Sequence, residues 1–390
     1  MAVQLIGIGT AVPEFALSQA QVRDLFLAEP DLAPLTARLI RAAYDNSAIE
    51  RRHTVIEDFA GGGGTFLDPE SRVIRAPGTA ARNEIYAREA PKLSETAARR
   101  ALHNAGVQPS EITHVVTASC TGFYAPGPEY RLVRDLGLDP TVEREHIGFM
   151  GCAAAIPALR SAWRICLADP TATVLVTCTE VCSIHIRSSS EPDQIVASAV
   201  FADGAATAVV TAQSPESSGP RELAAPSRGL ELTGFTTALT TDGEQDMAWI
   251  IGDHGFEMTL TGNVPRIVGR EVRAALAPVL ERTGAIDQWV VHPGGRSILD
   301  RFEQAMDLDE TALQRSRAIL RDYGNMSSAT VLFILADLLG DPTVAEGEQV
   351  LVTAFGPGLA VESATARIAA RQPIAAAESL RVGQADSARS

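Results

Sequence analysis

Three short segments each place one reactive residue beside a turn. Cys152 lies in GFMGCAAAIP, His292 in VVHPGGRSI and Asn325 in YGNMSSAT. Together they supply a thiol nucleophile, a base and an amide that donates hydrogen bonds. Such a set can take an acyl group from a thioester and build a new carbon–carbon bond on it, because the thiol carries the acyl group while the other two stabilise developing charge.

The flanks of these residues favour that chemistry over ordinary structural roles. Cys152 follows the strand-like run EHIGFMG and precedes AAAIPALRSAWRICLAD, which is predicted to be a helix. The unpaired N–H groups at a helix N-terminus favour a thiolate. Taken singly, Cys152 also fits a buried core cysteine, His292 a satisfied turn histidine and Asn325 an N-cap. The order Cys, His, Asn with these flanks is more specific than any one of the three.

The elements that must position these residues alternate between strands and helices, which indicates an α/β protein. VLVTCTEVCS and ATAVVTAQ have the β-branched composition of buried strands. Residues 212–229 are rich in Ser, Pro and Gly, and the periodic pattern stops there. We therefore expect two α/β halves, residues 1–215 carrying the cysteine and residues 230–370 carrying the histidine and the asparagine. Residues 371–390 are predicted to form a disordered tail.

Composition limits the possible partners. The chain has 390 residues, of which 46% are hydrophobic and 21% charged, an ordinary globular mixture with a net charge of −15. This acidic balance argues against nucleic acid or an anionic membrane as the main partner. No apolar stretch is long enough to span a membrane, and no signal peptide is evident.

The cysteines indicate a reducing compartment and do not indicate a metal site. The chain has five, without the spacing of an extracellular disulfide framework, so we expect reduced thiols in a cytoplasmic protein. Cys178 and Cys182 have three residues between them, but no second pair of Cys or His follows, so zinc is not expected.

The whole pattern resembles that of a type III polyketide synthase, the chalcone-synthase-like branch of the thiolase superfamily. The resemblance runs from IGTAVP to FGPGLAVES and is strongest at GCAA, HPGG, YGNMSSAT and FGPGLAVE, with Ala354 where a Gly is usual. TEVCSIHIRSS and ASCTGFYAPG look more like bacterial members than plant ones. The resemblance implies an α/β thiolase fold, a five-layer αβαβα arrangement of two pseudo-duplicated halves, and a homodimer.

The resemblance also implies a mechanism. Cys152 would take an acyl group from a CoA starter, and His292 would hold the thiol as an ion pair that lowers its pKa. His292 and Asn325 would then hydrogen-bond the thioester carbonyl of malonyl-CoA and stabilise the enolate formed when carbon dioxide leaves. The carbanion would attack the acyl-cysteine, and the lengthened chain would close into a ring. Acyl-CoA and malonyl-CoA are the implied partners, and no metal or organic cofactor is required.

Several positions match cavity residues of the family. Phe201 matches a gatekeeper between the CoA tunnel and the cavity, although a core aromatic residue is the alternative. Met258 stands where a second gatekeeper Phe is usual, and Trp249 where many plant-type members have Gly. An indole there should narrow the elongation chamber or turn a chain toward a side pocket.

The remaining substrate-binding candidates match cavity-lining or cyclisation positions. His185 stands where Thr is common, and Ala125 takes the place of a Met that reaches into the partner's cavity. The others are Cys120, Glu180 and Ser327.

Cationic side chains are needed for the phosphates of CoA. The family uses a basic cluster in the region of RLIRAAYDNSAIERRH, where Asn46 replaces a Lys, and a solvated helix face is the alternative. The candidates are Arg38, Arg41, Arg51 and Arg52, with Arg296 after HPGG.

Three functions follow from the resemblance. The first is a type III polyketide synthase that makes an alkylresorcinol or alkylpyrone from a fatty acyl-CoA. The second makes a small aromatic polyketide from malonyl-CoA alone, a choice that the bulky Trp249 keeps open. The third is a condensing enzyme like ketoacyl-carrier-protein synthase III, against which HPGG and GNMSSA favour the polyketide branch. A catalytically dead scaffold would lack one of the three reactive residues.

Overall fold

The structure is a computed structural model that describes residues 2–61, 64–213 and 228–370. The predicted tail, 371–390, lies outside the described residues, and so do residues 214–227 of the predicted boundary. None of the described helices is long and apolar enough to cross a membrane.

One mixed sheet of nine strands crosses the molecule in the order β11-β12-β13-β8-β1-β7-β6-β4-β5. Two small antiparallel sheets pair β2 with β3 and β9 with β10. The strands are β1 (Ala2–Ala11), β2 (Phe15–Ser18), β3 (Arg51–Thr54), β4 (His114–Ser119), β5 (Glu143–Gly148), β6 (Thr173–Val181), β7 (Asp203–Gln213), β8 (Arg228–Leu239), β9 (Met247–Gly252), β10 (Gly255–Leu260), β11 (Gln288–Val291), β12 (Gln349–Gly356) and β13 (Ala360–Ala370).

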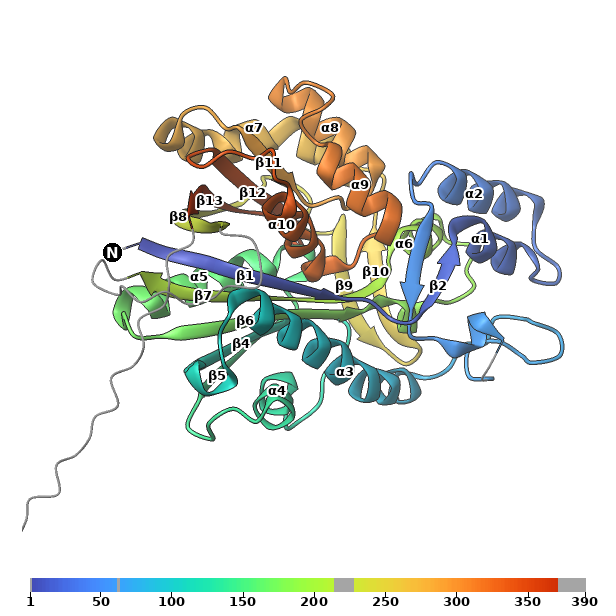
Figure 1. The fold of residues 1–390 in the computed structure, drawn as a ribbon. Helices are drawn as coiled ribbons and strands as arrows, with labels where there is room; N and C mark the ends of the chain where they lie inside the picture. The colour runs from blue at the N-terminus through green and yellow to red at the C-terminus, as the bar shows by residue number, and fades with distance from the viewer. Residues whose placement is uncertain (1, 62–63, 214–227, 371–390) are drawn as a thin grey trace, which may run out of the picture.

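Helices cover both faces of this sheet, and short 3₁₀ turns connect several of the elements (Figure 1). The helices are α1 (Gln19–Leu27), α2 (Pro34–Asp45), α3 (Thr79–Ala105), α4 (Pro128–Leu136), α5 (Ala155–Ala168), α6 (Pro192–Val200), α7 (Val264–Thr283), α8 (Arg296–Met306), α9 (Gln314–Tyr323) and α10 (Thr330–Gly340). The 3₁₀ turns are η1 (Glu57–Ala60), η2 (Pro109–Glu111), η3 (Gly151–Ala153), η4 (Cys182–His185) and η5 (Ser327–Ala329).

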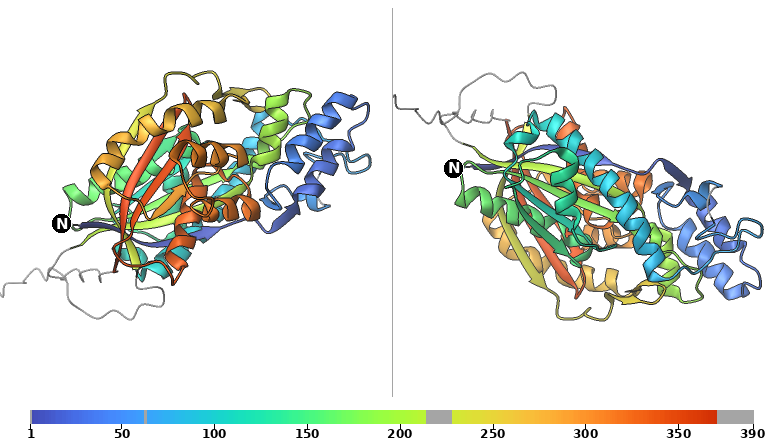
Figure 2. Two further views of the ribbon diagram at one scale, coloured as in Figure 1. Left: turned by 90° about the horizontal axis from the view of Figure 1, so that it is seen from above. Right: turned by 90° about the horizontal axis from the view of Figure 1, so that it is seen from below.

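The nine-stranded sheet has two half-sheets, one made of β1, β7, β6, β4 and β5 and the other of β8, β13, β12 and β11. The elements stack in the order helix, half-sheet, helix, half-sheet, helix. Helices α3 and α4 cover the outer face of β1, β7, β6, β4 and β5, while α7 lies against β8 and β13 of the other half. Helix α5 lies between the two half-sheets and contacts strands of both, and α10 reaches β1, β7 and β11 (Figures 1 and 2). The half-sheets join where Gln4 and Leu5 of β1 pair with Glu231 and Leu230 of β8. Helices α1 and α2 lie together at one end of the molecule.

The same sequence of elements occurs twice. In the first half α3 leads to β4 and α5 leads to β6 and β7; in the second, α7 leads to β11 and α10 leads to β12 and β13. The pairing repeats as well, because β4 is parallel to β6 and β6 antiparallel to β7, just as β11 is parallel to β12 and β12 antiparallel to β13. Cys152 therefore comes just before α5, and Asn325 just before α10, at matching positions of the two halves.

Sequence explains why α5 and α10 lie in the central layer. Helix α10, TVLFILADLLG, is apolar nearly all round, and Val331 and Ile334 are fully buried. A helix with that composition has to be covered on every side. In α5 the inward positions Ala155, Ala158 and Ala162 are small and fully buried, so two sheets can approach it closely. This central packing fixes the starts of both helices, where Cys152 and Asn325 lie.

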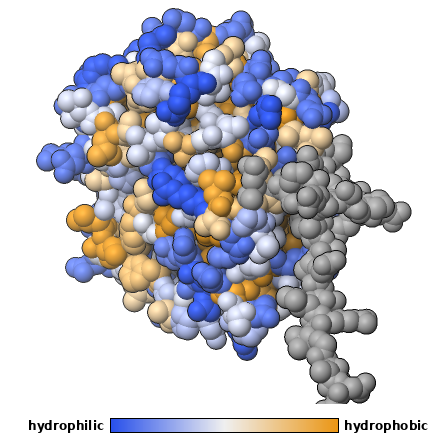
Figure 3. Space-filling view, turned by 90° about the vertical axis from the view of Figure 1, so that its left-hand side faces the viewer, coloured by the Kyte–Doolittle hydropathy of each residue, from blue (hydrophilic) through white to orange (hydrophobic). Residues whose placement is uncertain are grey.

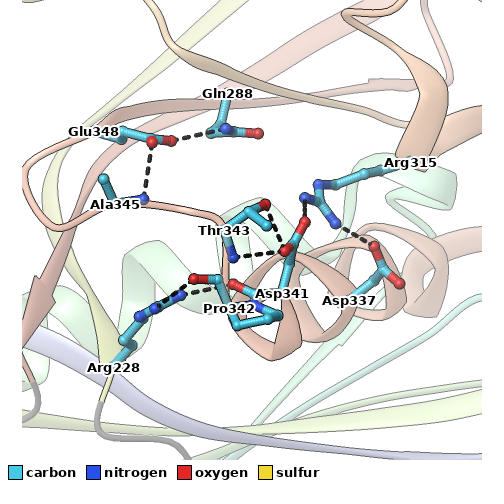
Figure 4. A network of polar contacts seen from close by, with 9 residues as sticks. All are labelled: Arg228, Gln288, Arg315, Asp337, Asp341, Pro342, Thr343, Ala345 and Glu348. Atoms are coloured by element: carbon cyan, nitrogen blue, oxygen red, sulfur yellow. Dashed lines mark hydrogen bonds and ion pairs between the residues drawn. The ribbon is translucent and has the colours of Figure 1, made fainter.

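Polar contacts tie the outer parts of the second half together (Figure 4). Arg315 of α9 is ion-paired with Asp337 and Asp341 at the end of α10. Arg228, at the start of β8, donates to the backbone carbonyl of Asp341 at 2.6 Å. Figure 3 shows that hydrophilic residues cover most of one face, with smaller hydrophobic patches between them.

Gly9 lets α3 lie directly on β1 and provides a test of this packing. A Cβ at Gly9 would overlap the backbone of Ala101 and Ala97. We predict that Gly9→Ala lowers the free energy of unfolding by about 3 kcal/mol, because neither backbone can yield without separating helix and sheet. Gly340→Ala is the matched control, since no atom lies within 4 Å of a Cβ there. Equal urea midpoints for the two variants would contradict the close packing.

Candidate active site

Cys152 lies at the turn between β5 and α5, as the sequence predicted. Gly151 precedes it with a φ of +61°, a conformation that favours glycine. A Cβ at Gly151 would come within 2.7 Å of Pro357 Cδ and 2.8 Å of Trp249 Cη2. Cys152 is 9% exposed, so the turn presents its thiol to an enclosed space at the start of the central helix.

His292 follows the last residue of β11, which is parallel to β12. Its backbone N–H donates to Thr353 O at 2.9 Å, which continues the pairing of β11 with β12 by one residue. The side chain is 1% exposed, and neither ring nitrogen has a hydrogen-bond partner among the described residues. Buried polar atoms are normally paired, so both nitrogens are free to bond a thiol or a substrate.

Asn325 is held by a short stretch of backbone pairing between the two halves. Its N–H donates to Val200 O at 2.9 Å, and its carbonyl accepts from Ala202 N at 2.8 Å. This places it beside Phe201, with which it forms an isolated bridge. The side-chain Oδ1 accepts from Ser327 N at 2.8 Å, and that contact directs Nδ2 as the remaining donor.

The asparagine side chain lies between the other two motifs. Its Nδ2 is 3.4 Å from Gly294 O in the loop after His292. The same side chain approaches Cys152 Sγ, with Oδ1 at 3.8 Å and Nδ2 at 3.9 Å. The structure thus brings all three predicted catalytic residues into one cavity.

Burial dominates the electrostatics of this trio. It raises the pKa of the Cys152 thiol to about 11 and lowers the pKa of His292 to about 3, because each group loses hydration of its charged form. Both pKa shifts favour an uncharged thiol and an uncharged imidazole. This is the reverse of the ion pair expected from the sequence. A neutral His292 can still activate Cys152 by accepting its proton during attack.

The cavity holds about 1270 Å³, its open mouth included. Its walls contain most of the predicted substrate-binding residues: Phe201, Met258, Trp249, Cys120, His185 and Ser327. Trp249 and Met258, the two departures from the usual pattern, are direct partners across the β9–β10 hairpin. Both therefore shape the same wall. Ala125 is exposed and is not among the cavity-lining residues.

Glu180 lies behind the cavity wall. It is fully buried, and its carboxylate accepts from Cys120 N at 3.0 Å, Thr121 Oγ1 at 2.9 Å and Ser328 Oγ at 2.5 Å. Burial raises its pKa. These bonds connect the turn after β4 to the turn before α10. Glu180 therefore stabilises the cavity wall without lining the cavity itself.

His185 is fixed on both sides of its ring. Its Nδ1 accepts from Phe256 N at 3.1 Å, so Nε2 carries the hydrogen and donates to Thr121 O at 2.7 Å. The ring is stacked on Phe256 with centroids 4.3 Å apart. Both nitrogens are occupied, and burial lowers the pKa of His185 to about 4, so it shapes the cavity as a neutral ring.

The predicted CoA-binding arginines fall into two environments. Arg38 and Arg41 on α2, Arg51 on β3 and Arg296 at the start of α8 are exposed. Arg296 lies next to Gly294 and Ile298, which line the cavity. Arg52 is 6% exposed and donates to backbone carbonyls, which sets it apart from the surface cluster in which the sequence placed it.

Sequence patterns missed part of the lining. Leu17, Val22 and Phe59, on β2, α1 and η1, form an apolar part of the lining that we call the apolar arm, and Cys182 and Gln194 also line the cavity. An apolar residue with regular spacing gives the same signal whether it faces a core or a cavity, so no pattern distinguishes these positions. Among the described residues, no group of His, Cys, Asp or Glu could hold a metal ion.

Comparison with known proteins agrees with this geometry. Residues 2–214 match the family model described as chalcone and stilbene synthases, N-terminal domain, and residues 231–369 match the corresponding C-terminal domain. The chain is also similar to the crystal structure of PKS-I from the brown alga Ectocarpus siliculosus, at 27% identity with a TM-score of 0.83, covering 94% of this chain and 98% of that one.

Two further solved structures have the same level of similarity. One is the C-terminal type III polyketide synthase domain of Steely1, a type I/III hybrid from Dictyostelium, at 27% identity and TM-score 0.83, covering 94% of this chain and 99% of that one. The other is 1,3,6,8-tetrahydroxynaphthalene synthase from Streptomyces coelicolor, at 27% identity with a TM-score of 0.82, covering 95% of this chain and 100% of that one. These matches confirm the five-layer thiolase fold expected from the sequence.

The fixed tautomer of His185 leads to a pH prediction. Its pKa is about 4 in the folded chain against 6.5 when free, so between these values the unfolded chain binds more protons. Its contribution to stability is therefore full above pH 6.5 and is lost as the pH falls. We predict that wild type loses about 1 kcal/mol more stability than His185→Thr between pH 7 and about 5.5 in urea titrations. Equal losses would contradict a neutral His185.

Proposed function

Because the chain belongs to the chalcone and stilbene synthase family of type III polyketide synthases, we propose that it loads an acyl-CoA starter onto Cys152 and extends it with malonyl-CoA. The product then closes into a ring. The observation that carries this proposal is the set of groups that share one cavity: the Cys152 thiol, the two unpartnered imidazole nitrogens of His292, and Asn325 Nδ2, whose contacts with Gly294 O and Cys152 Sγ are long at 3.4 and 3.9 Å. The family match also favours this function over a ketoacyl-carrier-protein synthase.

The loading step needs only the thiol and the imidazole. His292 accepts the proton of Cys152 while the sulfur attacks the thioester carbonyl of the starter. The CoA sulfur then leaves and takes up that proton, so charge is not left buried. The result is an acyl-Cys152 thioester and free CoA, with no change of oxidation state.

The extension step uses the donors beside the thiol. The thioester carbonyl of malonyl-CoA accepts hydrogen bonds from His292 and from Asn325 Nδ2. The carbon–carbon bond to the carboxylate breaks, carbon dioxide leaves, and the electron pair is held as an enolate whose oxygen faces these donors. The enolate carbon then attacks the acyl-Cys152 carbonyl and displaces the thiolate. We propose that no metal or organic cofactor takes part, because decarboxylation itself supplies the carbanion.

The apolar arm of the cavity favours a fatty acyl-CoA starter and an alkylresorcinol or alkylpyrone product. Leu17, Val22, Phe59 and Ile186 are each less than 10% exposed and line this arm. An alkyl chain placed there would be removed from water at about 0.8 kcal/mol for each CH₂ group.

The position of Trp249 favours the second candidate, a small aromatic polyketide made from malonyl-CoA alone. Its ring reaches the turn that carries Cys152, as its closeness to Gly151 shows. An indole there leaves less room for elongation. One of the similar structures is a tetrahydroxynaphthalene synthase from a bacterium. The algal, Dictyostelium and bacterial structures are all 27% identical to this chain, so membership of the bacterial branch stays a prediction.

A homodimer and a cytoplasmic location belong to the same proposal. Strand β5 lies at the end of the large sheet with most of its residues exposed. Near it, Phe123 is 47% and Phe149 42% exposed, and both rings lie beside Phe256. A second copy that packs on this edge would cover them and would meet Ala125. All five cysteines are free thiols, which supports a reducing compartment.

Loss of the thiol should abolish the reaction. We predict that Cys152→Ala forms no polyketide from labelled malonyl-CoA and a panel of acyl-CoA starters, read by mass spectrometry, because no acyl-enzyme can form. Cys166→Ala is the control, since Cys166 is buried in the same helix region but does not line the cavity. Normal product from the Cys152 variant would overturn the mechanism.

Trp249 should control the size of the product. We predict that Trp249→Gly lengthens the polyketide or changes its ring type, because removal of the indole opens space next to Cys152. Trp163→Phe serves as the control, since Trp163 packs on Phe235 away from the cavity lining. An unchanged product profile for Trp249→Gly would argue that the ring does not limit elongation.

A further inference from the structure

The C-terminus of α6 is capped by an unusual number of partners. A helix end leaves carbonyl groups without intrahelical partners. Here Ser198 O accepts from Arg52 Nη1 at 2.7 Å and Ala199 O accepts from Gln19 Nε2 at 2.7 Å. Val200 O accepts from Asn325 N at 2.9 Å. Side chains of the N-terminal region and the backbone of the second half therefore meet on one helix end.

Arg52 makes two of these bonds. Its Nη1 also donates to Phe201 O at 2.7 Å, so a single guanidinium nitrogen joins the carbonyls of Ser198 and Phe201. The Tyr44 hydroxyl, which donates to Ser198 O at 3.2 Å, supports the same carbonyl. A positive charge is also favoured at the negative end of the helix dipole.

The alkyl stem of Arg52 reaches the other side of the pairing. A Cβ at Gly324 would come within 3.0 Å of Arg52 Cγ, and Gly324 immediately precedes Asn325. Phe201, whose carbonyl Arg52 binds, is bridged to Asn325. One side chain thus touches both strands of the short pairing that holds the asparagine in place.

Arg52 lines the cavity but is almost wholly buried. It is 6% exposed, and burial lowers the pKa of its guanidinium. The face of Tyr44 lies 5.6 Å away. Its Nε and Nη2 are buried without partners, and the carboxylate of Asp203 acts on its charge without a direct hydrogen bond. Burying a cation is costly, so the retention of Arg52 calls for a role inside the protein.

We propose that Arg52 is a positioning residue that fixes Asn325 and the gatekeeper Phe201 by clamping the end of α6 to the turn before α10. It does not bind CoA. This inference rests on the proposed polyketide synthase function, in which Asn325 holds the malonyl thioester carbonyl. Without the clamp, Asn325 Nδ2 shifts relative to Cys152, and a displacement of about 1 Å is enough to cost about 100-fold in rate.

The first test separates positioning from CoA binding by kinetics. Release of labelled carbon dioxide from malonyl-CoA is measured for wild type, Arg52→Met, Arg52→Lys and the control Arg99→Met, a surface position on α3. We expect kcat of Arg52→Met to fall by about 10-fold or more, with KM within about 2-fold. Arg52→Lys should regain part of kcat, because its ammonium can still reach one carbonyl. A raised KM with unchanged kcat, or no change at all, would overturn the proposal.

The second test does not need activity, so it stands even where the proposed function fails. Hydrogen exchange is followed by mass spectrometry in peptides that cover residues 198–202 and 322–327. We expect faster exchange in both peptides for Arg52→Met and wild-type rates for Arg99→Met. If Arg52→Met does not fold, Gln19→Ala, which uncaps Ala199 O, should show the same change to a smaller extent. Wild-type exchange in a folded Arg52 or Gln19 variant would refute the clamp.

Discussion

The site depends on one constraint: three polar side chains from the two halves of the chain must be buried together, although both ring nitrogens of His292 have no hydrogen-bond partner among the described residues. A buried polar group without a partner costs free energy, so the scaffold has to hold each one in place by its backbone. Thr353 fixes the backbone of His292, Val200 and Ala202 fix that of Asn325, and the turn at Gly151 fixes Cys152. Both ring nitrogens of His292 are thereby left for a substrate.

The duplicated architecture explains why this constraint can be met. Helices α5 and α10 occupy matching places in the two halves and share the central layer, so their first residues meet where the half-sheets approach each other. Cys152 precedes one helix and Asn325 the other. The N-terminal region adds contacts to this arrangement, because Gln19 and Arg52 donate to backbone carbonyls of Ala199 and Phe201 at the end of α6.

Much of the fold and of the site could be predicted from the sequence. The features that could not be predicted were missed for identifiable physical reasons. Buried strands such as β6, the helix after Cys152 and the meeting of the three motifs follow from local composition and a family resemblance. The arm lined by Leu17 and Val22 could not be found, because a cavity wall and a core share one pattern. Arg52 was placed with surface cations, since its burial depends on contacts with Ser198 and Phe201 that are distant in sequence.

In the proposed reaction, Cys152 carries the acyl chain in the cavity that it shares with His292 and Asn325. The most direct test incubates the protein with a fatty acyl-CoA alone, without malonyl-CoA, and locates the adduct by peptide mass spectrometry. We predict one acyl group per chain, on the peptide that contains Cys152 and on no other cysteine. Acylation at another cysteine lining the cavity, such as Cys120 or Cys182, with none on Cys152, would contradict it.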